Sequence, residues 1–379
     1  MTLILTRLLY PKDEVIISLV NELLLKQNLD ICYYWTSEMY YSDKNIFWFM
    51  WKIYFDFYAE YNPKLEIYIK KKQVLYDTSQ ELQYLFDIIT NLFCCKISST
   101  VFLLRQYSLI TKKPLIIYRH SSHKKWNWLQ EYENKYHTLL KALSKDNLIT
   151  SVIQLQNILV HTDAKEVYHV IVSYYSKYIV LVASDKIEKK WNTRGWYDDF
   201  HGLLSLIVHL HTDMNNINKR HIIKKTNEKI TKYYIDIDNA INMRHKTKDR
   251  VYKILSDFRE YPLHEACSAF KLTKYIDTSF KNNNLLYWEY FAYKSPLWKG
   301  RIKEYRGVSC EKTKNIVFKN TDDAETFYKL YNMEFDEQSK IVQDLSLLVR
   351  KNIFWNTWYN KIFIDVPIIK FGDHFKFEY

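Results

Sequence analysis

The sequence predicts a mainly α-helical protein, a multi-helix globular body with a short C-terminal β-hairpin. The 379 residues include only five glycines and six prolines, whereas an average chain of this length has about 27 glycines. Few positions can then adopt a positive φ angle without strain, which favours long helices over tight hairpins. Hydrophobic residues make up 47% of the chain, so we expect it to be ordered nearly throughout.

Helical periodicity is the main signal along residues 1–281. Apolar side chains between Val15 and Leu24 recur three and four residues apart behind Pro11, which predicts the start of a helix. An Asp-Thr-Ser string at 77–79 precedes another apolar run and predicts a second start. The predicted helices cover residues 12–27, 46–61, 82–93, 124–143, 147–161, 163–180, 196–213, 222–241 and 245–257, with a buried strand at 178–182 as an alternative.

The last hundred residues change in character. The Asn-rich loop at 282–284 predicts a boundary between a helical body, 1–281, and a C-terminal segment, 282–379, although one domain is also possible. Gly372 lies between two strand-like runs, which predicts a terminal hairpin. The predicted elements are helices over 285–293, 297–305, 323–333 and 336–351, an irregular stretch over 307–320, and strands over 362–369 and 375–379.

Several classes of protein lack their signatures here. No glycine-rich phosphate loop and no Gly-x-Ser-x-Gly nucleophile turn occurs. The five cysteines form no Cys-x-x-Cys pair, so neither a zinc ribbon nor a thioredoxin-like motif is expected. The apolar stretches are shorter than the roughly 20 residues of a membrane span, and the N-terminus lacks the features of a secretory signal. The sequence predicts a cytoplasmic protein with no metal, cofactor or membrane span.

Histidine and paired carboxylates are the remaining candidates for catalysis. His120 and His123 share a helical spacing but have no carboxylate nearby in sequence, which favours a surface or capping role. His201, His209 and His211 are explained by a helix C-terminus that histidine stabilises. Other close pairs are His264 with Glu265, a candidate acid and base for a ribonuclease, Asp236 with Asp238, interpreted as surface charge balancing nearby lysines, and Asp322 with Asp323, interpreted as a helix cap. No catalytic residue is predicted.

The net charge of +12 favours attraction to nucleic acid. Residues 214–253 alone hold 11 lysines and arginines against four acidic residues. The candidate phosphate contacts are Lys219, Arg220, Lys224 and Lys225, with a solvated lysine-rich helix face as the alternative. The 33 tyrosines, 20 phenylalanines and 11 tryptophans offer rings on which single-stranded bases can stack, but an AT-rich coding sequence also explains the aromatic excess.

Two strings near the C-terminus carry a resemblance. They are LYWEYFAYKSPLWK at 286–299 and FYKLYNMEFDEQSK at 327–340. Together with the AT-rich composition, the chain resembles the immunity proteins encoded beside ribotoxins on yeast cytoplasmic linear killer plasmids, and their fungal relatives. The resemblance implies a cytosolic, non-enzymatic antitoxin that protects the producing cell from a tRNA- or rRNA-cleaving toxin. Its partner would be the toxin protein or the RNA target.

Aromatic residues of the first string are candidate anchors for such a partner, because tryptophan and tyrosine dominate binding energy at interfaces. These candidates are Trp288, Tyr290 and Trp298. The alternative is that Trp288, Phe291 and Trp298 are core residues of two packed helices. Two other functions stay open for the whole chain: a basic RNA-binding or RNA-processing protein, and a structural or assembly protein of a virus or plasmid.

Overall fold

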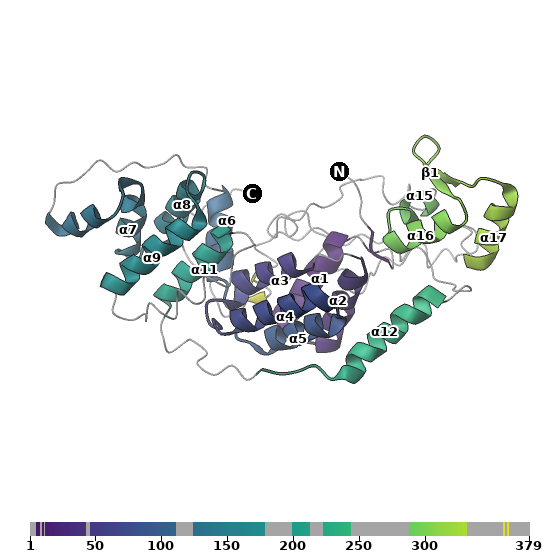
Figure 1. Cartoon of the computed structure of the whole chain (residues 1–379), viewed down its shortest axis with the longest axis horizontal. Helices are drawn as coiled ribbons and strands as arrows, with labels where there is room; N and C mark the ends of the chain where they lie inside the picture. The colour runs from purple at the N-terminus through teal and green to yellow at the C-terminus, as the bar shows by residue number, and fades with distance from the viewer. Residues whose placement is uncertain are drawn as a thin grey trace. The chain divides into compact units, whose positions relative to one another are not determined.

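The structure of the chain is a computed structural model that describes residues 5–7, 10, 12–42, 46–110, 124–178, 199–212, 223–243, 288–331, 359–360 and 362–363. Regular structure in these residues is helical apart from one two-stranded sheet (Figure 1), so the mainly α prediction is confirmed. The boundary predicted at 281/282, the helices predicted over 245–257 and 336–351, and the terminal hairpin apart from residues 362 and 363 lie outside the described residues.

The chain forms two compact units. Unit 1 comprises Met1–Ile46, Glu81–Phe93 and Lys224–Ile362, and unit 2 comprises Phe47–Gln80, Cys94–Ile223 and Phe363–Tyr379.

The first part of unit 1 has four helices among the residues that the structure describes. They are α1 (Lys12–Leu25), α2 (Leu29–Ser42), α5 (Leu82–Cys94) and α12 (Glu228–Met243). α1 packs against α2, and its residues Val15, Leu19 and Leu23 are fully buried, which is the apolar stripe that the sequence predicts. The ring of Phe86 on α5 lies 4.7 Å from that of Tyr33 on α2. Burial of each such side chain contributes roughly 1.5–3 kcal/mol.

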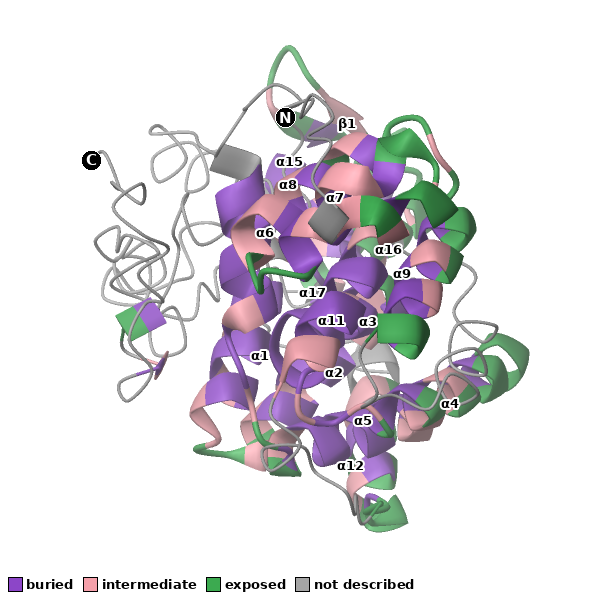
Figure 2. Cartoon of the chain, turned by 90° about the vertical axis from the view of Figure 1, so that its left-hand side faces the viewer, coloured by how far each residue is buried: buried purple, intermediate pink, exposed green. Residues whose placement is uncertain are grey.

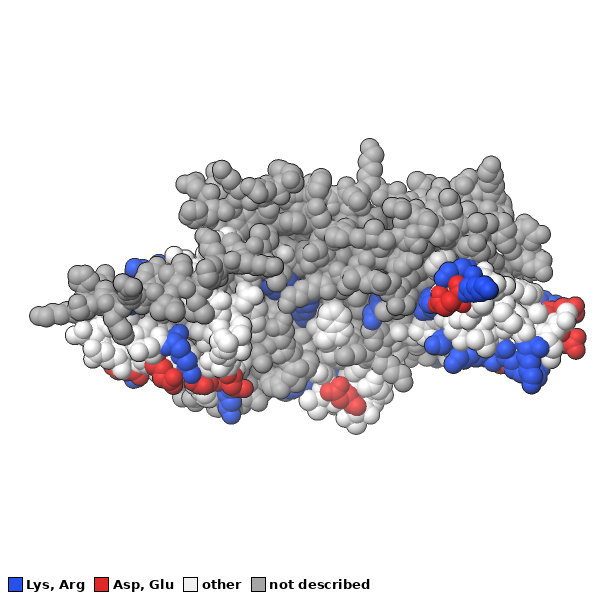
Figure 3. All heavy atoms as spheres, turned by 90° about the horizontal axis from the view of Figure 1, so that it is seen from above, with Lys and Arg blue, Asp and Glu red and all other residues white. Residues whose placement is uncertain are grey.

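The second part of unit 1 surrounds its own apolar cluster. It contains α15 (Trp288–Ala292), α16 (Pro296–Glu304), β1 (Val308–Cys310), β2 (Asn315–Val317) and α17 (Thr321–Tyr331). Phe291, Trp298, Ile302 and Phe327 are buried together in this cluster. Charged residues of both signs lie on the surface of these elements (Figure 3).

The hairpin of unit 1 lies where an irregular stretch was predicted. β1 and β2 are antiparallel, with Val308 opposite Val317 and Cys310 opposite Asn315. Three residues per strand are too few to show alternation in the sequence. Gly307 precedes β1 at a close approach, because a Cβ atom there would lie 2.6 Å from a methyl carbon of Ile302.

In the described ranges of unit 2 there are ten helical segments. They are α3 (Phe47–Ile53), the π-helical η1 (Tyr54–Tyr58), α4 (Leu65–Ser79), α6 (Thr100–Ile110), the 3₁₀ segments η2 (Lys124–Glu131) and η3 (Asn134–Tyr136), α7 (His137–Leu143), α8 (Leu148–Leu159), α9 (Ala164–Tyr178) and α11 (Asp199–His211). α11 contacts η1, α6, α8 and α9. Its residues 201–208 are all buried (Figure 2), so α11 lies at the centre of the unit 2 core.

The helix predicted over 82–93 is confirmed as α5, but the prediction that residues 77–79 open it is wrong. Residues 77–79 are the last turn of α4, a helix that the sequence did not predict, and do not begin α5. α4 ends at Gln80, which adopts the left-handed conformation with φ 55°. Glycine usually takes such a helix end, and its absence concealed the boundary. Among the helices of the described residues, none is long and apolar enough to cross a membrane.

Candidate nucleic-acid interface

A segment without regular secondary structure, residues 224–227, leads into α12 and is held by side chains of α5. Asn91 of α5 binds the backbone of Lys224 twice, because its Nδ2 donates to the carbonyl oxygen at 2.8 Å and its Oδ1 accepts from the amide at 3.0 Å. The amide of Thr226 donates to Asp87 at 2.9 Å, and its carbonyl oxygen accepts from Gln83 at 3.2 Å. Residues 83, 87 and 91 share one face of a helix, so side chains from a single face of α5 supply the hydrogen bonds to the backbone of this segment.

α12 itself is anchored by its buried tyrosine. Tyr234 is 7% exposed, and its hydroxyl donates to the carbonyl oxygen of Asp30 at 3.0 Å. Its ring meets Phe86 edge to face, with the ring centroids 5.3 Å apart. Burial raises the pKa of Tyr234, which keeps the hydroxyl protonated as a donor.

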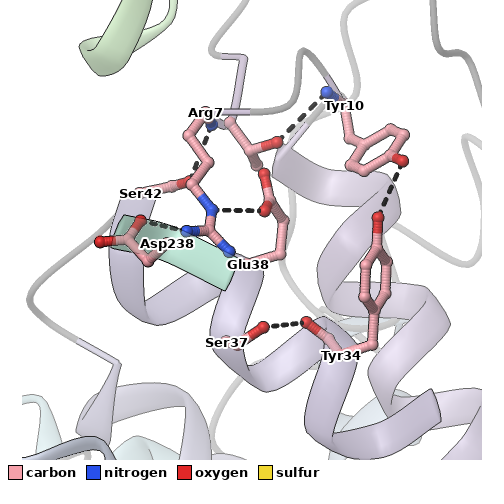
Figure 4. A network of polar contacts seen from close by, with 8 residues as sticks. Arg7, Tyr10, Tyr34, Ser37, Glu38, Ser42 and Asp238 are labelled. Atoms are coloured by element: carbon pink, nitrogen blue, oxygen red, sulfur yellow. Dashed lines mark hydrogen bonds and ion pairs between the residues drawn. The ribbon is translucent and has the colours of Figure 1, made fainter. Parts of the chain in front are cut away.

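A second anchor lies one turn further along α12 (Figure 4). Asp238 pairs with Arg7, whose Nε also donates to Glu38 of α2 at 2.9 Å. The side chains of Arg7 and Glu38 are 5% and 0% exposed, and the guanidinium lies 4.1 Å from the ring centroid of Tyr41. Asp238 therefore joins α12 to the N-terminal part of the chain, and the prediction that it balances a nearby lysine is wrong.

These anchors leave the opposite side of α12 exposed. Lys229, Lys232 and Tyr233 are exposed and follow the i, i+3, i+4 spacing of one helix face. Lys224 and Lys225 are exposed just before the helix. Within the described part of the chain, no carboxylate forms an ion pair with any of these four ammonium groups. We call Lys224, Lys225, Lys229, Lys232 and Tyr233 the α12 face.

The structure separates the residues that the sequence singled out. Lys224 and Lys225 belong to the α12 face, while Lys219 and Arg220 lie outside the described residues. Trp298 and Tyr290 are only 3% and 5% exposed and belong to the apolar cluster around α16, so in this structure they are core residues. Trp288 is the first residue of α15, but its side chain lies outside the description. The sequence did not single out Lys229, Lys232 or Tyr233, although all three lie in its predicted basic helix.

A buried charge cluster in unit 2 went unpredicted. Asp56 of η1 accepts two hydrogen bonds from Arg105 of α6, at 2.9 and 2.7 Å, and a third from Nε2 of His201 at 2.6 Å. All three residues are at most 2% exposed. Burial alone would raise the pKa of Asp56, but Arg105 and His201 outweigh it and lower the pKa. The inaccessibility of these side chains indicates a structural role, and the prediction that His201 stabilises a helix C-terminus is wrong.

The other histidines of α11 stay near its C-terminal end. Nδ1 of His209 donates to the carbonyl oxygen of Glu60 at 2.9 Å. Nδ1 of His211 lies 2.9 Å from the carbonyl oxygen of Ile207 on its own helix, the contact expected of histidine at a helix end. His120, His123, His264 and Glu265 lie outside the described residues.

Paired carboxylates form no catalytic arrangement in the part of the chain that the structure describes. The cap of α17 is Asn320, whose Oδ1 accepts from the amide of Asp323 at 2.8 Å, and Asp323 itself pairs with Arg306. Asp322 is exposed. No group of three or more histidine, cysteine, aspartate or glutamate side chains in the described ranges is arranged to hold a metal ion.

No known protein family, characterised protein or solved structure matches the chain.

Proposed function

We propose that the chain is a non-enzymatic RNA-binding protein, and that by shielding its RNA it acts as a cytosolic immunity protein against a tRNA- or rRNA-cleaving killer toxin. The α12 face carries the proposal, because it presents four accessible ammonium groups and an accessible aromatic ring on one anchored element. Lysines supply the phosphate contacts that dominate affinity for nucleic acid, and exposed aromatic rings supply stacking.

Rigid attachment supports this use of the α12 face. Side chains of α5 fix the backbone at Lys224 and Thr226, and Tyr234 and Asp238 fix α12. A surface that is ordered before binding loses less conformational entropy when it binds. The toxin part of the proposal rests on the resemblance of 286–299 and 327–340 to killer-plasmid immunity proteins, and it assigns the protective contact to the RNA, since Tyr290 and Trp298 are buried.

Protection in cells tests the proposal. The wild-type chain is expressed in a ribotoxin-sensitive yeast, which is then challenged with the toxin and scored for survival and for intact tRNA and rRNA. We expect protection by the wild type and its loss when Lys224, Lys225, Lys229 and Lys232 are all changed to Glu. Each of these side chains is exposed, so the fold should tolerate the change.

A matched control changes four other exposed lysines, Lys165, Lys312, Lys319 and Lys329, to Glu. It alters the net charge equally but leaves the α12 face intact, so protection should persist. Failure of the wild type to protect against any such toxin would overturn the immunity role. Equal loss of protection in both variants would show that only the net charge matters.

A further inference from the structure

The α12 face combines its lysines with one ring in an unusual position. Tyr233 is 61% exposed, while its neighbour Tyr234 is 7% exposed. Lys229 precedes Tyr233 by four residues, so the two side chains are neighbours on the helix surface, and Lys232 lies on the same side. The ring of Tyr233 therefore does not pack in the core and is accessible to a ligand beside the lysines.

We infer that the α12 face selects single-stranded RNA, with one unpaired base stacked on the ring of Tyr233 and the adjacent phosphates bound by the lysines. This inference rests on the RNA-binding function proposed above and adds the class of RNA. A base can stack on a side chain only where it is unpaired and accessible. In a duplex the bases stack on one another, so a duplex can use only the lysines.

The neighbouring contacts fix where the ring of Tyr233 points. Tyr234 is held by Asp30 and Phe86, and successive side chains of a helix point in different directions. The rings of Tyr233 and Tyr234 are 5.3 Å apart and nearly perpendicular, at 80°. Tyr233 therefore meets its neighbour edge to face and is held on the exposed side of the helix.

Charge gives the bound strand a position along the helix. The lysines lie from residue 224 to residue 232, while Asp236 is exposed one turn beyond Lys232 and repels phosphate. Glu228 is also exposed at the start of α12, between Lys225 and Lys229. The strand is therefore expected to follow the lysines on the N-terminal side of Tyr233 and to place its stacked base at the end of this track.

The test compares two labelled RNAs with the full chain by fluorescence anisotropy. One is an oligouridine of about 16 nucleotides, the upper end of single-strand site sizes, and the other is the same strand annealed to oligoadenosine. Tyr233→Ala is expected to weaken binding of the single strand roughly 5- to 150-fold, the usual range for loss of one stacked base. Binding of the duplex should stay unchanged. Tyr233→Phe keeps the ring and should restore single-strand affinity.

Two controls keep the outcomes distinct. Tyr178→Ala removes a partly exposed tyrosine of unit 2 and should leave both affinities unchanged, and circular dichroism checks that each variant is folded. Equal weakening of single-strand and duplex binding by Tyr233→Ala would overturn the inference. The inference would also fail if Tyr233→Ala weakened neither, although the combined change of Lys225, Lys229 and Lys232 to Gln reduced binding. No effect of either the tyrosine or the lysine changes would overturn the RNA-binding function itself.

Discussion

Replacement of Asn91 by Ala should release the segment that leads into α12. Asn91 is fully buried, and its amide group makes two hydrogen bonds to the backbone of Lys224, at 2.8 and 3.0 Å. Each bond contributes about 0.5–1.5 kcal/mol net, so the variant should lose about 2 kcal/mol of local stability. The amide and carbonyl groups of Lys224 would then bind water in place of a side chain.

Native-state hydrogen exchange measures this loss directly. A decrease of about 2 kcal/mol in the free energy of local opening corresponds to roughly 30-fold faster exchange of the Lys224 amide. The Thr226 amide donates to Asp87 at 2.9 Å and not to Asn91, so its exchange should accelerate less. Thr78→Ala is the control, because it removes one exposed hydrogen bond to the carbonyl oxygen of Val74 and should change stability by less than about 0.5 kcal/mol. Unchanged exchange at Lys224 in the Asn91 variant would refute this account of how the segment is held.

Four further changes test the packing within each unit by urea denaturation. Asp56→Asn leaves Arg105 buried without its carboxylate and should cost about 3–5 kcal/mol of stability at neutral pH. Folding lowers the pKa of Asp56, so the stability that its carboxylate contributes is present above the ordinary pKa near 3.9 and is lost as the pH falls. The difference in stability between variant and wild type should therefore become smaller in acid, and a difference that does not change with pH would contradict the ion pairing. Gly307→Ala places a Cβ atom 2.6 Å from a methyl carbon of Ile302 and should cost about 1–3 kcal/mol, whereas Gly300→Ala, with open space in the middle of α16, should stabilise by about 0.5–1 kcal/mol. Lys26→Gly should stabilise the fold slightly. The left-handed φ of 54° at Lys26 costs an ordinary residue about 1–2 kcal/mol, whereas the greater chain entropy that Gly loses on folding costs only about 0.5–1 kcal/mol. A loss of stability would show that Lys26 makes contacts that outweigh its backbone strain.

The low glycine content was informative about fold class but not about helix ends. It predicts long helices, and the described residues confirm a mainly α chain. Helix ends and turns nevertheless need positive φ angles. Non-glycine residues take them at Lys26, Gln80, Asp146, Arg306 and Lys314, so the usual sequence signal for a C-terminus is missing. For this reason residues 77–79, the last turn of α4, were interpreted as the residues that open the helix over 82–93.

Periodicity predicted elements whose apolar stripe is regular and missed those with mixed faces. α1 and α5 were expected because their buried residues recur at helical spacing. α2 was not, since its buried face includes polar Thr36, Ser37 and Glu38 alongside aromatic residues. The helix predicted from residue 222 begins only at Glu228, because side chains of α5 bind the backbone of the preceding residues. Such contacts between distant parts of the chain have no local signature.

The candidate site was predictable in composition but not in geometry. The basic bias of residues 214–253 singled out Lys224 and Lys225, which are exposed. Nothing in the sequence distinguished Tyr233 from Tyr234, because which tyrosine is buried depends on Phe86 and Asp30. Likewise, the pairing of Asp56 with Arg105 and His201 joins residues up to 145 positions apart, and no spacing rule relates them.

The salt dependence of RNA binding tests the central claim most directly. For single strands, the logarithm of the binding constant falls with the logarithm of salt concentration by about 0.7 for each phosphate that is neutralised. Changing Lys225, Lys229 and Lys232 to Gln should therefore make the slope for oligouridine less steep by about 2, while the same change at Lys165, Lys312 and Lys319 should leave it as in the wild type. Identical slopes for the wild type and the α12 variant would contradict phosphate binding by the α12 face.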